Sequence, residues 1–345
     1  PKPATAERAA FYAWAIGKPA DAAALPQAVR DLLAFRAGTT TVVPDVPFQM
    51  LTALPLTKEH WIAIGRKAGW HMLRMNLNTF MRHKAFEDEE FTRFVADRLR
   101  DEKAVRKAKV FPYQLMAAHA MASNVPAAIR EALQDAMEIA VGNVPAVDGR
   151  VVICPDVSGS MSSPVTGFRR GATSAVRCID VAGLVAAAFL RANREARVIP
   201  FEQDVVEIDL NPRDTVLTNA AKLASIGGGG TNCSAPLEQL VAEKAKVDLV
   251  VFVSDNESWM DADPNGYRGT AMMQSWQKLK ARNPEAKLIC INIQPSTTTQ
   301  AVERPDILNI GGFSDAVFDV IGAFHRGELT PDHWVGEIEK FTLAE

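Results

Sequence analysis

The spacing of apolar residues predicts a succession of helices over the first 145 residues. Between about His60 and Met81, apolar side chains recur at the steps of three and four that mark one helix face, at Trp61, Ile64, Ala68, Met72 and Met75. Two further stripes follow in residues 91–99 and 129–136, the second of them after a capping residue, Asn124. The links between helices are short and contain Pro or Gly, so we expect stacked helical pairs rather than a compact bundle.

From Gly149 onward, short β-branched runs alternate with helical patterns. The expected strands are residues 151–154, 198–201, 205–208, 247–253 and 288–293, and the expected helices are 179–193, 236–246, 272–282 and 315–324. This alternation predicts a doubly wound parallel sheet with helices on both faces. The predicted fold class is therefore α plus α/β, with a helical-repeat (HEAT-like) module in residues 1–147 and a parallel-sheet domain in residues 148–345.

Composition fits a globular protein, since 48% of the 345 residues are hydrophobic and 23% are charged. The longest apolar run, residues 181–190, is too short to span a bilayer, and no signal peptide is recognisable, so we expect a cytoplasmic protein. The four cysteines are scattered and predict reduced thiols. The chain begins at Pro1 without an initiator Met, and we expect its helical module to be incomplete at the N-terminus.

Oxygen-bearing side chains follow the strands of the predicted sheet. The first strand runs into Asp156-Val157-Ser158-Gly159-Ser160, a glycine-rich loop at 227–230 leads to Thr231, and the strand at 247–253 leads to Asp255. Ligands bind outside the carboxyl ends of parallel strands, and two carboxylates with three hydroxyls suit Mg²⁺. We predict that a divalent cation is held by Asp156, Ser158, Ser160, Thr231 and Asp255. Taken alone, each segment is also typical of an ordinary turn.

These five residues resemble the metal-ion-dependent adhesion site of von Willebrand factor A domains. More specifically, residues 229–234, 254–258, 312–315 and 319–321 resemble the Ro ribonucleoprotein autoantigen family, which joins a helical TROVE module to a von Willebrand A domain. In the first half, residues 55–57, 74–78 and 111–113 resemble TROVE segments. One departure is Asn232, which stands where some relatives have Asp.

The resemblance implies an RNA-binding scaffold that takes small non-coding Y-like RNA and the 3′ ends of misfolded RNA in RNA quality control. It also implies an exoribonuclease as a partner and a helical module longer than the one in this chain. In the family the helical repeats close into a ring, so either the first helices lie upstream of Pro1 or the ring of this protein is smaller or open. No Ser-His-Asp set, phosphate-binding loop or paired-His metal motif is recognisable, so we expect no enzymatic activity.

RNA binding needs cations for phosphates and planar groups for bases. Residues 1–150 carry 20 Lys and Arg against 16 Asp and Glu, and the candidates for RNA contact are Arg66, Lys67, His71, Arg74, Arg82, His83 and Lys84. Lys67, His71 and Arg74 follow helical steps and are expected on one helix face. The basic segment 98–109 is either a second RNA patch or a solvated helix surface.

A protein–protein assembly or adhesion module is the alternative function. In that case the metal site recognises a carboxylate of a partner, and the helices only support the domain. If the protein is such a module, loss of Asp156 should abolish capture of the partner and leave any RNA binding unchanged.

Overall fold

The computed structural model describes residues 5–144, 146–168, 175–255, 271–294, 301–312, 314, 316–329, 335–336 and 338–340. The chain forms two compact units, Pro1–Leu99 with Asn124–Glu131 and Arg100–Ser123 with Ala132–Glu345. Residues on the N-terminal side of the predicted boundary after residue 147 thus contribute to the second unit. The fold class predicted from the sequence is confirmed, with a helical region followed by a parallel sheet that carries helices.

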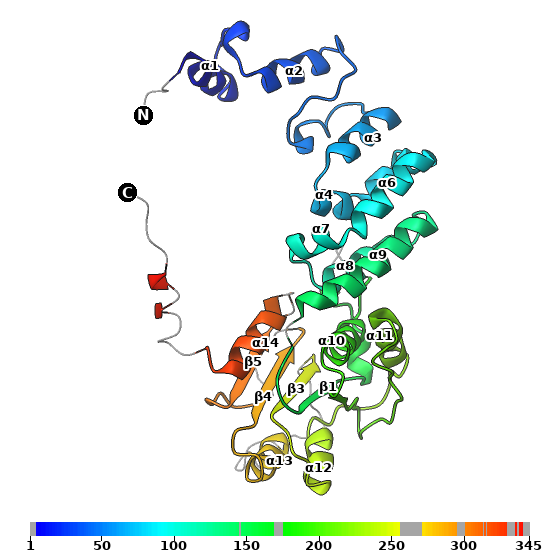
Figure 1. Ribbon diagram of the computed structural model, residues 1–345, viewed down its shortest axis with the longest axis vertical. Coiled ribbons are helices and arrows are strands. Elements are labelled where there is room, and N and C mark those ends of the chain that lie inside the picture. Colours follow the sequence, from blue (N-terminus) through cyan, green and yellow to red (C-terminus); the bar gives the residue numbers. More distant parts are fainter. Residues whose placement is uncertain are drawn as a thin grey trace. The chain divides into compact units, whose positions relative to one another are not determined.

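The first unit is helical, as its apolar periodicity predicts (Figure 1). Its core contains an aromatic cluster in which Phe80 lies edge-on to Trp61 at 6.2 Å and to Phe91 at 5.5 Å between ring centroids. Edge-to-face pairs of this kind add to the burial of apolar area. The α-helices of this unit are α1 (Ala6–Ala15), α2 (Gln27–Arg36), α3 (Lys58–Lys67), α4 (Trp70–Met75), α5 (Leu77–Arg82) and α6 (Glu89–Leu99), with 3₁₀ turns η1 (Ala22–Ala24), η2 (Phe48–Met50) and η3 (Ala85–Glu87).

The continuous helix expected from about His60 to Met81 is wrong, because the structure divides it into α3, α4 and α5. Helix α3 ends at Lys67, and Ala68 and Gly69 have extended backbone before α4 begins. A glycine stabilises helix poorly, so it favours a break at this point. The second break is at Asn76, whose side-chain amide donates to the Met72 carbonyl at 2.9 Å and competes with the helical hydrogen bonds.

The second unit contains a five-stranded parallel sheet in the order β2-β1-β3-β4-β5 (Figure 1). In its centre, β1 pairs with β3, which places Pro155 opposite Val253 and brings both carboxyl ends to one edge. Strands buried on both faces read as continuous apolar runs, and all the residues of β1 and β3 are buried. The strands are β1 (Val151–Pro155), β2 (Arg197–Val198), β3 (Leu249–Ser254), β4 (Lys287–Asn292) and β5 (Ile307–Gly311).

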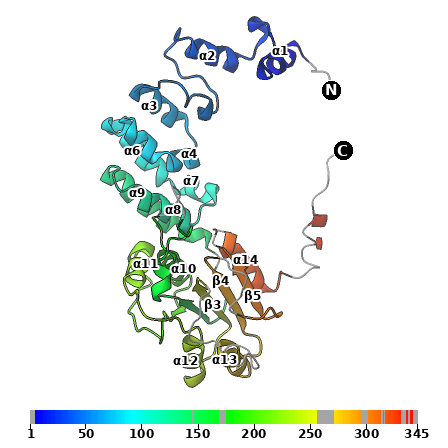
Figure 2. The same ribbon diagram turned by 180° about the vertical axis from the view of Figure 1, so that it is seen from behind.

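Helices cover both faces of this sheet, as Figure 2 shows from behind. Trp276 of α13 and Leu237 of α12 join one apolar cluster with alternate strand residues such as Phe252. On the other face α10 lies against β1 and β3, and its Phe189 contacts Phe318 of α14 at 5.6 Å between ring centroids. The helices of this layer structure are α10 (Cys178–Ala192), α11 (Val216–Ala224), α12 (Ala235–Ala242), α13 (Ala271–Lys280) and α14 (Ala316–Arg326).

Helices α10 and α11 approach each other closely at one glycine. A Cβ added to Gly183 would lie 2.8 Å from the Ala220 carbonyl oxygen, so no larger residue fits between the two backbones. The second unit also contains helices that precede the sheet: α7 (Glu102–Ala108), α8 (Pro112–Met121) and the greater part of α9 (Ala127–Ala140), with η4 (Val141–Asn143) and η5 (Gly159–Ser162). Within the ranges that the structure describes, no helix is long and apolar enough to cross a membrane.

Three elements of the second unit differ from the sequence expectation. Residues 205–208 form no strand, although Val206 N donates to the Pro200 carbonyl at 2.8 Å. Pro200 has no N–H to return a hydrogen bond, which explains why the ladder stops there. Strand β5 and helix α11 were not predicted, because Ile307–Gly311 is short and half-buried, and because the apolar positions of Val216–Ala224 lie within a polar stretch.

Candidate functional site

The carboxylate of Asp156 is fixed at the carboxyl end of β1. Its backbone N–H donates to Val253 O at 2.9 Å, which continues the pairing of β1 with β3 past the last residue of β1. Oδ1 accepts from the Ser158 N–H at 2.9 Å, and Oδ2 accepts from the Ser254 hydroxyl at 2.6 Å. Asp156 is fully buried, so its orientation is set by these hydrogen bonds rather than by water.

Three hydroxyls converge beside this carboxylate. Ser158 Oγ lies 3.2 Å from Ser160 Oγ and accepts a hydrogen bond of 2.9 Å from Thr231 Oγ1. The glycine-rich loop makes this possible, because Gly228 N donates to Val157 O at 3.2 Å and Gly159 N donates to Gly229 O at 3.2 Å. The structure thus brings together Asp156, Ser158, Ser160 and Thr231, from segments that are 73 residues apart in the sequence.

The second carboxylate, Asp255, directly follows β3 and is 8% exposed. The pKa of Asp156 is raised to about 6, mainly because burial removes its carboxylate from water. Hydrogen bonds from Ser158 and Ser254 lower this pKa, and the negative charge of Asp255 raises it. Asp255 thus contributes to the raised pKa of Asp156, but less than burial does. Within the described residues, no group of three or more His, Cys, Asp or Glu side chains is placed to hold a metal ion, so hydroxyls make up the larger part of this donor set.

Two further residues at this edge were not identified from the sequence. Ser254 donates to Asp156, and Glu202 lies against the glycine-rich loop, where a Cβ added to Gly229 would be 2.6 Å from Glu202 Oε2. Ser254 is the last residue of β3. Glu202 follows Phe201, whose N–H donates to Pro155 O at 3.1 Å and so extends the pairing of β2 with β1. The rule that side chains after parallel strands share one edge would have identified both.

The family comparison matches this domain. A family model described as the Ro60 vWA domain, a von Willebrand A domain, matches residues 150–325, which is about half of the chain. The chain belongs to the Ro family. The match begins at the residue before β1 and ends within α14, so it contains Asp156, Ser158, Ser160, Thr231 and Asp255. The motif residues 256–258, 313 and 315 lie outside the described residues.

The similarity of this chain to other members of the Ro family extends beyond that domain. The RNA-binding protein RO60 of Deinococcus radiodurans is 28% identical over 266 residues, which cover 70% of this chain and 46% of that protein. The RNA-binding protein RO60 of Caenorhabditis elegans is 22% identical over 254 residues, covering 70% and 38%. The chain thus spans less than half the length of these relatives. The crystal structure of the Deinococcus radiodurans RO (RSR) protein shares the fold, with a TM-score of 0.70, 22% identity, and coverage of 95% of this chain and 69% of that one.

The RNA candidates on α3 and α4 do not form one helix face. Lys67 ends α3 and donates to the Val43 carbonyl at 3.2 Å, whereas His71 and Arg74 belong to α4. Both residues of α4 contact one ring: His71 lies edge-on to Trp70 at 5.4 Å, and the Arg74 guanidinium is 5.9 Å from its centroid. The expected single face is therefore wrong, because the helix break at Ala68 and Gly69 separates Lys67 from the other two.

The remaining RNA candidates differ in how they are held. Arg66 pairs with Glu90 at 2.9 Å and lies over Phe94, while His83 stacks on Trp61 at 4.7 Å between ring centroids. Arg82, the last residue of α5, and Lys84, in a left-handed conformation with φ of 60°, are exposed. Arg66, Lys67 and His71 are exposed as well, so five of the seven candidates are accessible to a polyanion.

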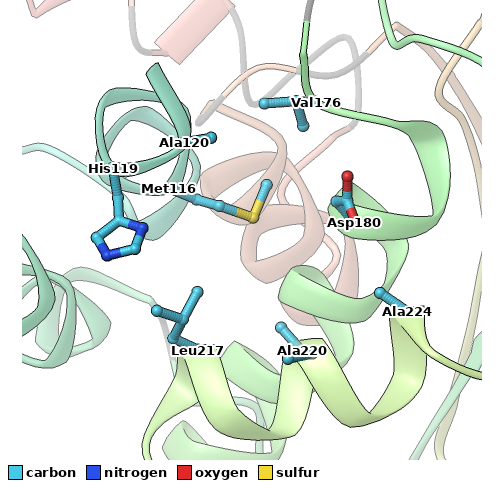
Figure 3. Close-up of a pocket in the computed structure, with 9 residues that line it drawn as sticks. Met116, His119, Ala120, Val176, Asp180, Leu217, Ala220 and Ala224 are labelled. Atoms are coloured by element: carbon cyan, nitrogen blue, oxygen red, sulfur yellow. The ribbon is translucent and has the colours of Figure 1, made fainter. Parts of the chain in front are cut away.

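A cavity of about 210 Å³ lies between α8, α10 and α11 (Figure 3). His119 and Asp180 line it from opposite sides, with Met116 and Leu217 among the apolar groups around them. The Asp180 carboxylate accepts from Arg177 side-chain nitrogens at 2.7 and 3.1 Å, within the cap of α10. Arg177 thus fixes the Asp180 carboxylate at one side of the cavity, and apolar side chains from the three helices form most of its wall.

Proposed function

We propose that this chain is an RNA-binding scaffold of the Ro type, which binds small non-coding Y-like RNA and single-stranded 3′ ends of misfolded RNA in the cytoplasm. The observation that carries this proposal is the extent of its similarity to the RNA-binding protein RO60 of Deinococcus radiodurans. That similarity covers 70% of the chain, whereas the matched domain accounts for about half, so it continues into the helices. A shared helical region supports a shared ligand.

The charges of the helical unit support the same ligand. Arg66, Lys67, His71, Arg82 and Lys84 are exposed, and cations at a surface can contact the phosphates of RNA. Contacts of this kind release counterions, so binding falls steeply with salt. An exoribonuclease that acts on the bound RNA is the partner that the family resemblance implies.

In the same proposal the sheet domain holds a divalent cation. Asp156, Ser158, Ser160, Thr231 and Asp255 would be its ligands, and their five oxygen-bearing side chains suit Mg²⁺. The bound ion would supply an open position for an oxygen of a partner. We propose no enzymatic role, because the three hydroxyls hydrogen-bond to one another, whereas a nucleophilic serine needs a base for its proton.

Electrophoretic mobility shift with a Y-like stem–loop RNA that has a single-stranded 3′ tail tests the proposal. We expect binding at 50 mM salt that weakens about a hundredfold or more at 200 mM salt. The double variant Arg82→Gln/Lys84→Gln should bind at least fivefold more weakly than the control Arg8→Gln/Lys18→Gln, which removes two exposed cations elsewhere in the first unit. Absence of binding at low salt would overturn the proposal.

The second candidate function is a protein-assembly module that captures a partner carboxylate. The observation that favours it is the rim itself, where Ser158 lies within hydrogen-bonding distance of both Thr231 and Ser160 beside a buried carboxylate. This function needs the cation site and not the helical cations. A variant at Asp156 therefore separates the two functions.

A further inference from the structure

A hollow of about 500 Å³ lies beside the basic end of α7, in the second unit, whereas the RNA candidates belong to the first unit. All of its walls belong to the second unit. One side is formed by the C-terminal end of α7 and the segment after it, and the other by the first turn of α14. The lining residues are Arg106, Lys109, Phe111, Asn143, Ala316 and Asp319. Its volume falls in the range of sites that take small molecules or single nucleotides.

The wall of the hollow is held in place by packing that does not involve a ligand. Phe111 stacks on Phe318 of α14 at 5.4 Å with an interplanar angle of 14°, and Phe318 in turn contacts Phe189 of α10. Asn143 donates from its side chain to the Val110 carbonyl at 2.7 Å, which joins η4 to the segment after α7. The hollow is thus preformed, and binding would cost little ordering of the backbone.

Two cations line this hollow. Lys109 caps α7 in the left-handed conformation, with φ of 48° and its N–H donating to the Arg106 carbonyl at 3.1 Å. Glycine is the usual residue at such a position because a side chain there is strained, so a lysine places an ammonium at the rim at some cost in stability. In the part of the chain that the structure describes, Lys109 makes no ion pair.

The Arg106 guanidinium lines the hollow and also pairs with a carboxylate of its own helix. Its Nε and Nη2 atoms lie 3.0 and 2.9 Å from Glu102 Oε1, one turn earlier on α7. The remaining nitrogen, Nη1, lies close to Gly142, where an added Cβ would be 2.9 Å away. Glycine at 142 therefore leaves room for the guanidinium at this wall. A guanidinium and an ammonium together are the groups that bind a phosphate diester.

Asp319 makes the hollow unsuitable for a bare phosphate. It lies in the first turn of α14 and is exposed, and an ionised carboxylate only accepts hydrogen bonds. A ligand that fits both ends must carry a negative group for Arg106 and Lys109 and a hydroxyl donor for Asp319. A ribonucleotide unit has both, since its 2′-hydroxyl can donate and its phosphate is anionic.

We propose that this hollow binds one nucleotide of single-stranded RNA, with its phosphate on Arg106 and Lys109 and its 2′-hydroxyl on Asp319. The inference rests on the proposed RNA-binding function and assigns it a second contact site, on the sheet-containing unit. It gives the basic segment 98–109 a role beyond a solvated helix surface.

Fluorescence anisotropy with the full chain and a fluorescein-labelled twelve-nucleotide oligouridylate tests the site. The double variant Arg106→Gln/Lys109→Gln should bind at least fivefold more weakly than the wild-type chain, and the slope of log affinity against log salt should fall by about 1. The control Lys103→Gln/Lys107→Gln removes the same charge from exposed positions of α7 and should change affinity less than twofold.

The 2′-hydroxyl contact has a signature of its own. Asp319→Asn should lose the preference for oligouridylate over oligodeoxyuridylate, whereas Arg106→Gln/Lys109→Gln should weaken both ligands equally. Acetylation of lysines, read by mass spectrometry, should show that oligouridylate protects Lys109 more than Lys103 and Lys107.

The outcomes separate this inference from the proposed function. If the wild-type chain binds oligouridylate but both double variants weaken it equally and Lys109 is not protected, the hollow is not an RNA site, while the RNA-binding function stands. If the wild-type chain binds neither oligouridylate nor Y-like RNA at low salt, both proposals are overturned.

Discussion

Thr231 donates a hydrogen bond of 2.9 Å to the Ser158 hydroxyl, across 73 residues of sequence. Both side chains are buried, so the contact is protected from water. It joins the loop after β1 to the loop after α11 and holds two oxygens on one side of Asp156. The rim is therefore largely preorganised by hydrogen bonds before any ion is bound, and each bond can be removed singly.

Replacement of Thr231 by Val tests the contribution of this hydroxyl to cation binding. Valine keeps the side-chain shape and removes the oxygen, so Mg²⁺ affinity measured by isothermal titration calorimetry should fall about tenfold or more. Ser225→Ala, at an exposed hydroxyl after α11, should leave the affinity unchanged. Equal affinities for Thr231→Val and the wild-type chain would remove Thr231 from the ligand set.

The glycine-rich loop offers a matched pair of substitutions. Gly229 and Gly167 have nearly the same positive φ, 64° and 63°, but a Cβ at Gly229 meets the Glu202 carboxylate at 2.6 Å and a Cβ at Gly167 meets nothing within 4 Å. Gly167→Ala should cost about 1 kcal/mol in the free energy of urea unfolding, from the left-handed backbone alone. Gly229→Ala should cost more and should also weaken Mg²⁺ binding.

The double variant Gly229→Ala/Glu202→Ala checks the cause of that difference. Removal of the Glu202 carboxylate takes away the clash, so the stability of the double variant should return towards that of Gly167→Ala. A double variant as unstable as Gly229→Ala would show that the backbone conformation, and not Glu202, sets the cost.

Asp156→Asn distinguishes the two proposed functions. The amide retains an oxygen that accepts from Ser158 N–H, so the fold should persist, but the loss of charge should abolish detectable Mg²⁺ binding. We expect Y-like RNA to bind this variant within twofold of the wild-type chain, and metal-dependent capture of a carboxylate partner to be lost. RNA binding that disappears together with the metal would contradict two independent sites.

The pair of Arg197 and Glu243 predicts a pH effect on stability. Hydrogen bonds from Arg197 of β2 hold the pKa of Glu243 at about 2, below its ordinary value of 4.5. Because the folded-state pKa is the lower one, the pair stabilises the fold above about pH 4.5, and this contribution is lost as the pH falls towards 2. Both side chains are more than one third exposed, so its size is at most about 1 kcal/mol.

Urea unfolding of Glu243→Gln checks this effect. The variant should be less stable than the wild-type chain at pH 7 and equal to it near pH 2, whereas Glu207→Gln, at an exposed carboxylate outside the helices, should match the wild-type chain at pH 7. A Glu243→Gln variant as stable as the wild-type chain at pH 7 would show that the pair contributes nothing.

The features that the sequence predicted best are those that depend on residues close together in the chain. Strands β1, β3 and β4 were predicted because the centre of each is an apolar run, and the carboxyl-end rule placed Asp156 and Asp255 at one edge. The convergence of Ser158, Ser160 and Thr231 followed from the same rule. These are consequences of strand direction, which a pattern of alternating elements determines.

What the sequence did not predict depends on contacts between distant segments. The break between α3 and α4 removed the expected face of Lys67, His71 and Arg74, because one weak helix former ended a good apolar stripe. Glu202 directly follows the expected strand 198–201, so the carboxyl-end rule would have placed it at this edge, but its contact with Gly229 depends on where the glycine-rich loop lies. The hollow beside Lys109 is formed by α7 and α14, which are separated by most of the sheet domain.

Pro200 disfavours pairing between the sheet edges of two copies of this chain. It follows β2, the outermost strand on that side of the sheet, and offers no N–H where an incoming extended segment would need a donor. The same residue that ends pairing with 205–208 thus makes this border a poor template for edge-to-edge aggregation.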